Sequence, residues 1–435
     1  MDPLPFRNRR LRLLDHMQAA GGGVAIIPTA AERIRNRDTH FPFRADSYFH
    51  YLTGFPEPEA VLALIAGPSP QAILFCREKD AEKEIWDGFR YGPAAAREIF
   101  AFDAAHSIAE FEAKLPDLLA DQPALWYSLG HDADWDARIV KAMNAVRAQT
   151  RAGKRAPSVT HDVRAVLDAM RLVKDDHEIT LMRRAAQIAA SAHRRAMRAT
   201  APGKYEYEIE AEFLHEFRRH GCQAPAYPPI VAGGANACIL HYVANDQPLE
   251  DGKLILIDAG CELDGYASDI TRSFPVNGRF SGPQADLYQL VLDAQTAAIA
   301  AVKPGVSFLA PHEAALRVLV QGMIDLKLLV GSRDGLIESE AYKRFYMHRT
   351  GHWLGLDVHD AGEYRQNETW TTLQAGMTLT VEPGLYVRAA DDVPAAFHDI
   401  GIRIEDDVLV TAHGCEVLSC DAPKTIAAIE AEMKR

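Results

Sequence analysis

The chain has 435 residues, of which 48% are hydrophobic and 25% are charged, and its formal net charge is −13. This length exceeds what one ordinary hydrophobic core covers, so we expect two domains in a soluble globular protein. The negative charge, and the lack of an apolar stretch long enough to span a membrane, argue against nucleic acid and membranes as partners.

Residues 1–170 alternate short apolar runs with segments of helical character. Strands are predicted for GGVAIIPTA, AVLALIAG, AILFCRE and ALWYSLG, and helical segments for residues 80–100 and 106–120. Strands that alternate with helices indicate an α/β N-terminal domain over residues 1–170. The polar, basic stretch 147–158 is interpreted as a linker that leads toward the second domain.

Residues 171–435 show a different pattern. A long helix is predicted from Asp175, and further helices over residues 205–221, 285–305 and 310–329. Strand-like runs lie between and after them, including LILID, MTLTVEPGLYV and GIRIEDDVLVT. The pattern indicates an α+β domain over residues 171–435, in which helices cover a mainly antiparallel sheet.

The six cysteines include no Cys-x-x-Cys pair. This usage is typical of reduced thiols, so we expect a cytoplasmic protein without a disulfide framework. Cys261 lies close to Asp258 in the sequence, and we interpret it as a small buried side chain because no base is evidently paired with it.

Two acids frame the segment LILIDAGCELDGYASDIT, residues 254–271. Asp258 ends an apolar run, and Asp269 follows eleven positions later among residues that favour a strand. Gly260 and the letters LDG supply turn residues, so the two flanks can pair as antiparallel strands that bring the acids together. Two carboxylates this close repel each other unless one is protonated or a cation lies between them.

Two further acids and two histidines occur in apolar surroundings. Glu382 lies in TVEPGLYV, Glu405 in GIRIEDDVLV, and His352 and His359 in RTGHWLGLDVHD. Carboxylates together with an imidazole suit divalent ions such as Mn²⁺, Co²⁺ or Zn²⁺. Four carboxylates exceed the need of one ion, so the set predicts two cations that share bridging carboxylates.

Each of these residues taken alone also has a structural interpretation. An Asp at a strand end is usually a turn cap, and a histidine among apolar residues is usually a satisfied core residue. Glu382 can pair with Arg388, and Glu405 with Arg403, in ordinary salt bridges. Five such coincidences in one half of the chain favour the metal site.

At these residues the C-terminal half resembles the pita-bread metallopeptidases, whose ordered ligand set is Asp, Asp, His, Glu, Glu. The set falls here on Asp258 in LIDAG, Asp269 in SDIT, His352 in GHWLG, Glu382 in TVEPG and Glu405 in RIEDD. Within that family, ILHYVAND, HWLGLDVHD and ADSYFHYLTGFPEPEAVLAL are similar to aminopeptidase P, the Xaa-Pro aminopeptidase.

The resemblance implies a fold and a metal site. Residues 1–170 would form a creatinase-N-like α/β domain that gates substrate and supports oligomers, and residues 171–435 the catalytic pita-bread domain. Two divalent ions, typically Mn²⁺ with Co²⁺ or Zn²⁺ as alternatives, would be bound. Asp258 would hold one ion, His352 and Glu382 the other, with Asp269 and Glu405 as bridges.

The resemblance also implies a reaction. A metal-bridging hydroxide would cleave the bond between an N-terminal residue and a following proline, and Glu382 would shuttle the proton. His241 and His359 would hydrogen-bond the substrate carbonyl and the oxyanion, and Arg403 would orient the ligands.

Four other residues match secondary active-site positions of the family: Tyr227, His348, Asp38 and Trp86. Tyr227, Asp38 and Trp86 would contact substrate, and His348 would take part in catalysis. His348 can also be read as a core histidine, Trp86 as ordinary packing and Asp38 as a turn residue. A basic residue near 147–158 would also approach substrate, and the choice between Arg151 and Arg155 stays open.

The expected partners are peptides with proline in the second position, in a homodimer or homotetramer. One alternative is a prolidase restricted to Xaa-Pro dipeptides, which would share all five ligands. Another is a catalytically idle pita-bread binding module, against which the complete ligand set argues.

Overall fold

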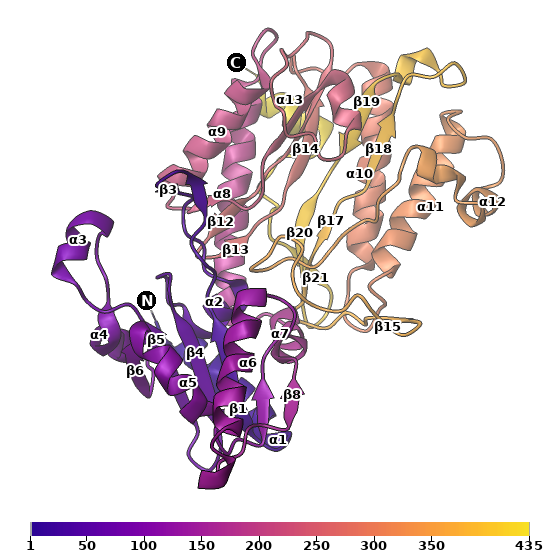
Figure 1. Ribbon diagram of the computed structural model, residues 1–435. Helices are drawn as coiled ribbons and strands as arrows, with labels where there is room; N and C mark the ends of the chain where they lie inside the picture. The colour runs from indigo at the N-terminus through magenta and orange to yellow at the C-terminus, as the bar shows by residue number, and fades with distance from the viewer. Residues whose placement is uncertain (1, 435) are drawn as a thin grey trace. The chain divides into compact units, whose positions relative to one another are not determined.

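The computed structural model describes residues 2–434 and divides between Met170 and Arg171 into two compact units (Figure 1). In Figure 1 the first unit runs from indigo to magenta and the second from magenta to yellow. Among the described residues, no helix combines the length and the apolar character that a membrane span needs.

The N-terminal unit is built on a six-stranded sheet in the order β6-β5-β4-β1-β7-β8. Its strands are β1 (Gly23–Pro28), β2 (Ile34–Asn36), β3 (Thr39–His40), β4 (Val61–Ala66), β5 (Gln71–Cys76), β6 (Ala104–Ser107), β7 (Ala124–Trp126) and β8 (Val159–His161). Its helices are α1 (Leu4–Ala19), α2 (Ser47–Thr53), α3 (Ala81–Asp87), α4 (Gly92–Ile99), α5 (Phe111–Leu119), α6 (Ala133–Arg147) and α7 (Val163–Leu172), the last of which runs across the division.

Strand β4 is antiparallel to both of its neighbours, and the other pairs of this sheet are parallel. Val24 and Ile26 alternate along β1 and share one buried cluster with apolar residues of α5 and α6. The stretch 147–158 is not a linker between domains. It connects α6 to β8, which pairs with β7 as the last strand of the sheet.

The C-terminal unit combines helices with short sheets whose recorded strand pairs, among the described residues, are all antiparallel. Its helices are α8 (Asp176–Ala199), α9 (Glu206–Arg219), α10 (Gly282–Ala301), α11 (Ala310–Asp325), α12 (Arg333–Glu338) and α13 (Ile426–Glu432). Its strands are β9 (Ala224–Pro225), β10 (Ile230–Gly233), β11 (Leu254–Asp258), β12 (Cys261–Leu263), β13 (Tyr266–Ala267), β14 (Thr271–Pro275), β15 (Arg365–Gln366), β16 (Thr369–Trp370), β17 (Thr378–Val381), β18 (Gly384–Val387), β19 (Ile400–Arg403), β20 (Asp406–Val410) and β21 (Cys415–Val417).

The long helices begin where the sequence supplies caps. The side chain of Asp175 accepts a hydrogen bond from the Glu178 amide at 3.0 Å, and the Glu178 carboxylate accepts one from the Asp175 amide at 3.0 Å. This capping box starts α8, and a second one at Ser281 starts α10. Helices α8 and α9 lie side by side, as do α10 and α11 (Figure 1).

The segment between the two aspartates folds back on itself. Strands β11 and β14 pair antiparallel with Asp258 opposite Thr271, which confirms the predicted pairing. The small hairpin β12–β13 turns at Asp264 and Gly265, which both have positive φ as a two-residue type I′ turn requires. At Gly260 a Cβ atom would lie 1.6 Å from the Ser268 carbonyl oxygen, so only glycine allows the loop to approach this closely.

The two glutamates lie at matching breaks in the sheet. Strand β17 pairs with β20 up to Val381 opposite Asp406, and β18 pairs with β19 starting at Gly384 opposite Arg403. Glu382 and Glu405 occupy the short gaps between these ladders. Each glutamate lies between the end of one ladder and the start of the other. The two side chains therefore start from neighbouring backbone positions.

Candidate metal centre

One cavity in the C-terminal unit, of about 790 Å³, gathers the predicted residues of that unit. Its lining includes Tyr227, His241, Asp258, Asp269, His348, His352, His359, Glu382, Arg403 and Glu405. Asp38 and Trp86 belong to the N-terminal unit, where both are exposed, as do Arg151 and Arg155. These four residues remain predictions.

The first two acids lie beside a tyrosine. The Tyr227 hydroxyl is 2.5 Å from Asp258 Oδ1 and 2.5 Å from Asp269 Oδ1, so its single proton can be donated to only one of them at a time. Burial, followed by the charges of both carboxylates, raises the pKa of Tyr227 well above its usual value. The phenol therefore stays protonated and links two carboxylates that would otherwise repel each other.

His352 projects between acids from segments that are distant in the sequence. Its Nδ1 lies 3.0 Å from the Trp353 carbonyl oxygen, which requires a proton on Nδ1. Its Nε2 lies 3.3 Å from Asp269 Oδ2 and 3.6 Å from Glu382 Oε1. Burial alone would lower the pKa of His352, but the hydrogen bond to Asp269 and the charge of Glu382 raise it to about 9.

The carboxylates of the cavity crowd one another. Burial raises the pKa of Asp258, with the Arg403 charge opposing, and it raises the pKa of Glu382 to about 7. Burial and the charges of Asp269 and Glu382 raise the pKa of Glu405 well above its usual range. For Asp269 the burial effect is outweighed by the hydrogen bond from His352, which lowers its pKa. Three of the four carboxylates thus have raised pKa values, so ionising all four together is unfavourable unless a cation is added.

Arg403 connects the acids through three separate contacts. It donates to Asp258 Oδ2 at 2.6 Å, to the Tyr386 hydroxyl at 2.9 Å and to Thr271 Oγ1 at 3.2 Å. The Thr271 hydroxyl in turn donates to Glu405 Oε2 at 2.6 Å. Arg403 therefore forms its ion pair with Asp258 and reaches Glu405 through Thr271, so it fixes two of the four acids.

The donor set fits a divalent cation. Asp269, His352 and Glu405 each offer a ligand atom, and these atoms lie within 4.8 Å of one another. The proton on His352 Nδ1 directs the other ring nitrogen toward the acids, which is the usual arrangement of a metal-binding histidine. Oxygen donors with one imidazole suit Mn²⁺, Co²⁺ and Zn²⁺, and cations would offset the excess of negative charge.

The other three histidines border the cavity in different environments. His348 Nε2 lies 2.8 Å from the Tyr386 hydroxyl, and burial lowers the pKa of His348 to about 3, so the ring is neutral. The His359 ring contacts the His352 ring with 4.3 Å between centroids. His241 and His359 are both exposed at the cavity, where a ligand can reach their nitrogens.

Two residues that the sequence prediction missed are Tyr386 and Thr271. Tyr386 joins His348 to Arg403, and Thr271 joins Arg403 to Glu405. Both are hydroxyl residues in strands that are buried along their whole length. A polar side chain in such a strand needs a partner, and this is the signal that could have revealed them.

Comparisons with known proteins agree with this geometry. The model of metallopeptidase family M24 matches residues 180–412, and that of the aminopeptidase P N-terminal domain matches residues 6–126. An Xaa-Pro aminopeptidase of Haemophilus influenzae is 46% identical over 98% of this chain and 96% of its own.

Solved structures match over nearly the whole length as well. An aminopeptidase of Pseudomonas aeruginosa has a TM-score of 0.95 at 48% identity and covers 98% of both chains. A variant of Escherichia coli aminopeptidase P in complex with substrate has a TM-score of 0.96 at 42% identity, covering 100% of this chain and 98% of that one.

These matches confirm the predicted resemblance and fold class, an α/β domain followed by an α+β pita-bread domain. The cluster of carboxylates around His352 is the feature that such a metallopeptidase needs. The chain belongs to metallopeptidase family M24, with an N-terminal domain of the aminopeptidase P type.

Proposed function

We propose that this chain is an Xaa-Pro aminopeptidase, which hydrolyses the bond between an N-terminal residue and a following proline. The observation that carries the proposal is the convergence of Asp258, Asp269, His352, Glu382 and Glu405 on one cavity. Membership of the family and the similarity to Xaa-Pro aminopeptidases over nearly the whole chain support it.

We assign these five side chains to two divalent ions, with Mn²⁺ as the proposed metal and Co²⁺ or Zn²⁺ as compatible ones. Asp258 would hold one ion, His352 and Glu382 the other, and Asp269 and Glu405 both. When bound, the ions would polarise the scissile carbonyl and lower the pKa of a bound water.

The chain's own residues would do the remaining work. Glu382 would take up the proton released during attack and carry it to the proline nitrogen, which has no hydrogen of its own. His241 and His359, exposed at the cavity, would donate hydrogen bonds to the carbonyl oxygen as it gains charge. Arg403 would keep Asp258 and, through Thr271, Glu405 in place.

The remaining assignments are proposals of the same kind. Tyr227, Asp38 and Trp86 would contact substrate, and His348 would assist catalysis from the cavity wall. The protein would act in the cytoplasm as a homodimer or homotetramer on peptides that carry proline in second position.

A substrate series tests the proposal. The purified chain, loaded with Mn²⁺, should release the first residue from an Xaa-Pro-Yaa tripeptide and lose this activity on chelation until Mn²⁺ is returned. Turnover of Xaa-Pro dipeptides only would instead identify a prolidase. A chain that holds no divalent metal and stays inactive with Mn²⁺ would be a binding module. An Xaa-Ala-Yaa peptide is the matched control.

A further inference from the structure

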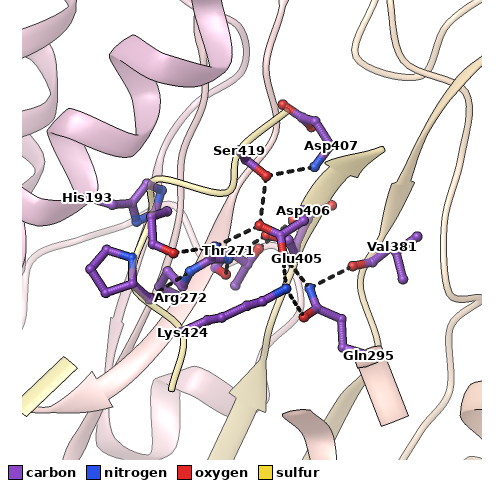
Figure 2. A network of polar contacts seen from close by, with 12 residues as sticks. His193, Thr271, Arg272, Gln295, Val381, Glu405, Asp406, Asp407, Ser419 and Lys424 are labelled. Atoms are coloured by element: carbon purple, nitrogen blue, oxygen red, sulfur yellow. Dashed lines mark hydrogen bonds and ion pairs between the residues drawn. The ribbon is translucent and has the colours of Figure 1, made fainter. Parts of the chain in front are cut away.

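The segments that carry the candidate ligands are joined to a second polar network that does not line the cavity. Figure 2 shows Arg272, Asp406 and Lys424 at its centre, with Gln295 and Ser419 beside them. Arg272 and Asp406 are each 0% exposed. Burial of this many charged atoms is costly unless every charge is paired, so their contacts define what the network holds in place.

Arg272 donates hydrogen bonds to the main chain at Thr271 and at Glu405. One of its amino groups donates to the Glu405 carbonyl oxygen at 2.6 Å and to the Thr271 carbonyl oxygen at 2.9 Å. The other donates to Asp406 Oδ1 at 2.7 Å. The Glu405 amide donates to the Thr271 carbonyl oxygen at 3.1 Å. Arg272 thus fixes the backbone that presents the Glu405 carboxylate.

Asp406 accepts hydrogen bonds from the other side chains of the network. Its Oδ2 accepts from Lys424 Nζ at 2.6 Å and from Gln295 Nε2 at 3.0 Å, and its Oδ1 also accepts from Ser419 Oγ at 2.7 Å. The same amide group of Gln295 donates to the Val381 carbonyl oxygen at 3.3 Å (Figure 2). Val381 directly precedes Glu382, so the network also reaches the strand end that carries a second candidate ligand.

Ser419 extends the network to a third ligand. Its hydroxyl oxygen accepts from the Asp407 amide at 3.1 Å, and the Asp407 carboxylate accepts from the Asp269 amide at 3.1 and 3.2 Å. The backbone at Asp269, Glu382 and Glu405 is therefore tied to one set of buried side chains.

The outer part of the network comes from the C-terminal segment 419–424. Arg272 donates to the carbonyl oxygens of Ala422 and Pro423, both at 3.0 Å, while Ser419 and Lys424 contact Asp406 through their side chains. Groups that orient metal ligands from outside typically change metal affinity by about 10- to 100-fold when they are removed.

We propose that the Arg272–Asp406–Lys424 network positions Asp269, Glu382 and Glu405 for metal binding, with segment 419–424 as its outer support. This inference rests on the proposed ligand set. The three acids repel one another, so without fixed backbones they would move apart and a cation would have to draw them together at a cost in affinity.

Lys424 gives the sharpest test. Its side chain is 27% exposed, so a substitution by Met, which has a similar length, should not open a cavity in the core. Titration of the metal-free full chain with Mn²⁺ by calorimetry should show about tenfold weaker binding for Lys424→Met. Lys424→Arg, which keeps the charge, should recover most of the affinity. Lys343→Met is the matched control, because Lys343 pairs with Glu340 at the exposed surface. This variant should bind Mn²⁺ with the affinity of the unmodified chain.

Thermal unfolding of the same metal-free samples separates positioning from mere stability. A Lys424→Met chain with a lower melting temperature and an unchanged Mn²⁺ affinity would overturn the inference. If that chain fails to fold, Ser419→Ala decides, with an expected weakening of about fivefold and rejection if the affinity is unchanged. An unmodified chain that binds no Mn²⁺ would contradict the proposed ligand set and with it this inference.

Discussion

Two groups of charges in the C-terminal unit differ in their balance. In one, Arg171 contacts Asp357 at 2.7 Å and Asp360 at 2.6 Å, and Lys174 contacts Asp360 at 2.8 Å, so two cations face two acids. In the candidate metal centre, four acids line one cavity, where Arg403 forms an ion pair with Asp258 and His352 lies beside Asp269 and Glu382. In the first group the numbers of acids and cations match, whereas the second needs added positive charge. An excess of acidic over basic side chains, rather than burial alone, distinguishes the candidate metal centre from the first group.

The difference in balance predicts opposite effects when one acid is neutralised. Glu405→Gln should lower peptide hydrolysis by at least about 1000-fold, because a bridging charge is lost. Its pKa is raised by burial and by Asp269 and Glu382, so the charged form is unfavourable in the folded chain. The metal-free variant should therefore melt at a higher temperature than the unmodified chain. Near-normal hydrolysis would contradict the bridging role, and Glu340→Gln, at the surface, is the control.

Neutralising an acid of the balanced group should have the reverse effect. Asp360→Asn removes the buried acid that Arg171 and Lys174 share and should lower the free energy of unfolding by about 3–5 kcal/mol. Urea unfolding followed by circular dichroism measures this change. A loss below about 1 kcal/mol would show that the two groups do not differ as described.

A third buried group, the His193 side chain, is kept neutral. Its effect on the stability of the folded chain should be measurable only at acidic pH. Burial, followed by the charge of Arg272, lowers the pKa of His193 to about 3. An unfolded histidine has a pKa of about 6.5, so below that pH the unfolded chain binds a proton that the folded chain does not. Stability should fall by about 1.4 kcal/mol for each pH unit from about 6 down toward 3.

His193→Gln tests this assignment because its amide can still donate to the Ala259 carbonyl oxygen, which lies 3.1 Å from His193 Nε2. The variant should lose less stability between pH 6 and pH 4 than the unmodified chain. Parallel pH curves for the two proteins would mean that the acid sensitivity comes from other groups.

The smallest expected effect concerns the neutral link between the acids. Tyr227→Phe removes the hydroxyl that lies 2.5 Å from both Asp258 and Asp269. We expect Mn²⁺ affinity to fall by about tenfold, as measured by calorimetry, while the fold is kept. Unchanged affinity would show that Arg403 and His352 suffice to hold the two acids.

Much of the fold was predictable because local signals agreed with the final structure. The helix predicted from Asp175 begins at its cap there, and the turn at Asp264 and Gly265 fits its hairpin. Helix α10 begins at Gly282, three residues before the predicted start, because Ser281 caps it. The stretch 147–158 was misread because its polar, basic composition is shared by loops inside a domain and by linkers between domains.

The site was predictable only to the extent that its residues stand in recognisable motifs. Asp258, Asp269, His352, Glu382 and Glu405 each lie in such a motif, and the cavity brings all five together. Thr271, Tyr386 and Arg272 act through contacts between strands that are distant in the sequence. No local pattern encodes those contacts, because they depend on which strands become neighbours.

One cysteine, Cys420, is exposed, whereas the other five are buried or half-buried. It directly follows Ser419 and does not line the cavity. A nitroxide or fluorophore attached to that thiol would sit beside the C-terminal segment and outside the cavity lining. Paramagnetic broadening or quenching at this position would then give a spectroscopic record of metal loading during turnover.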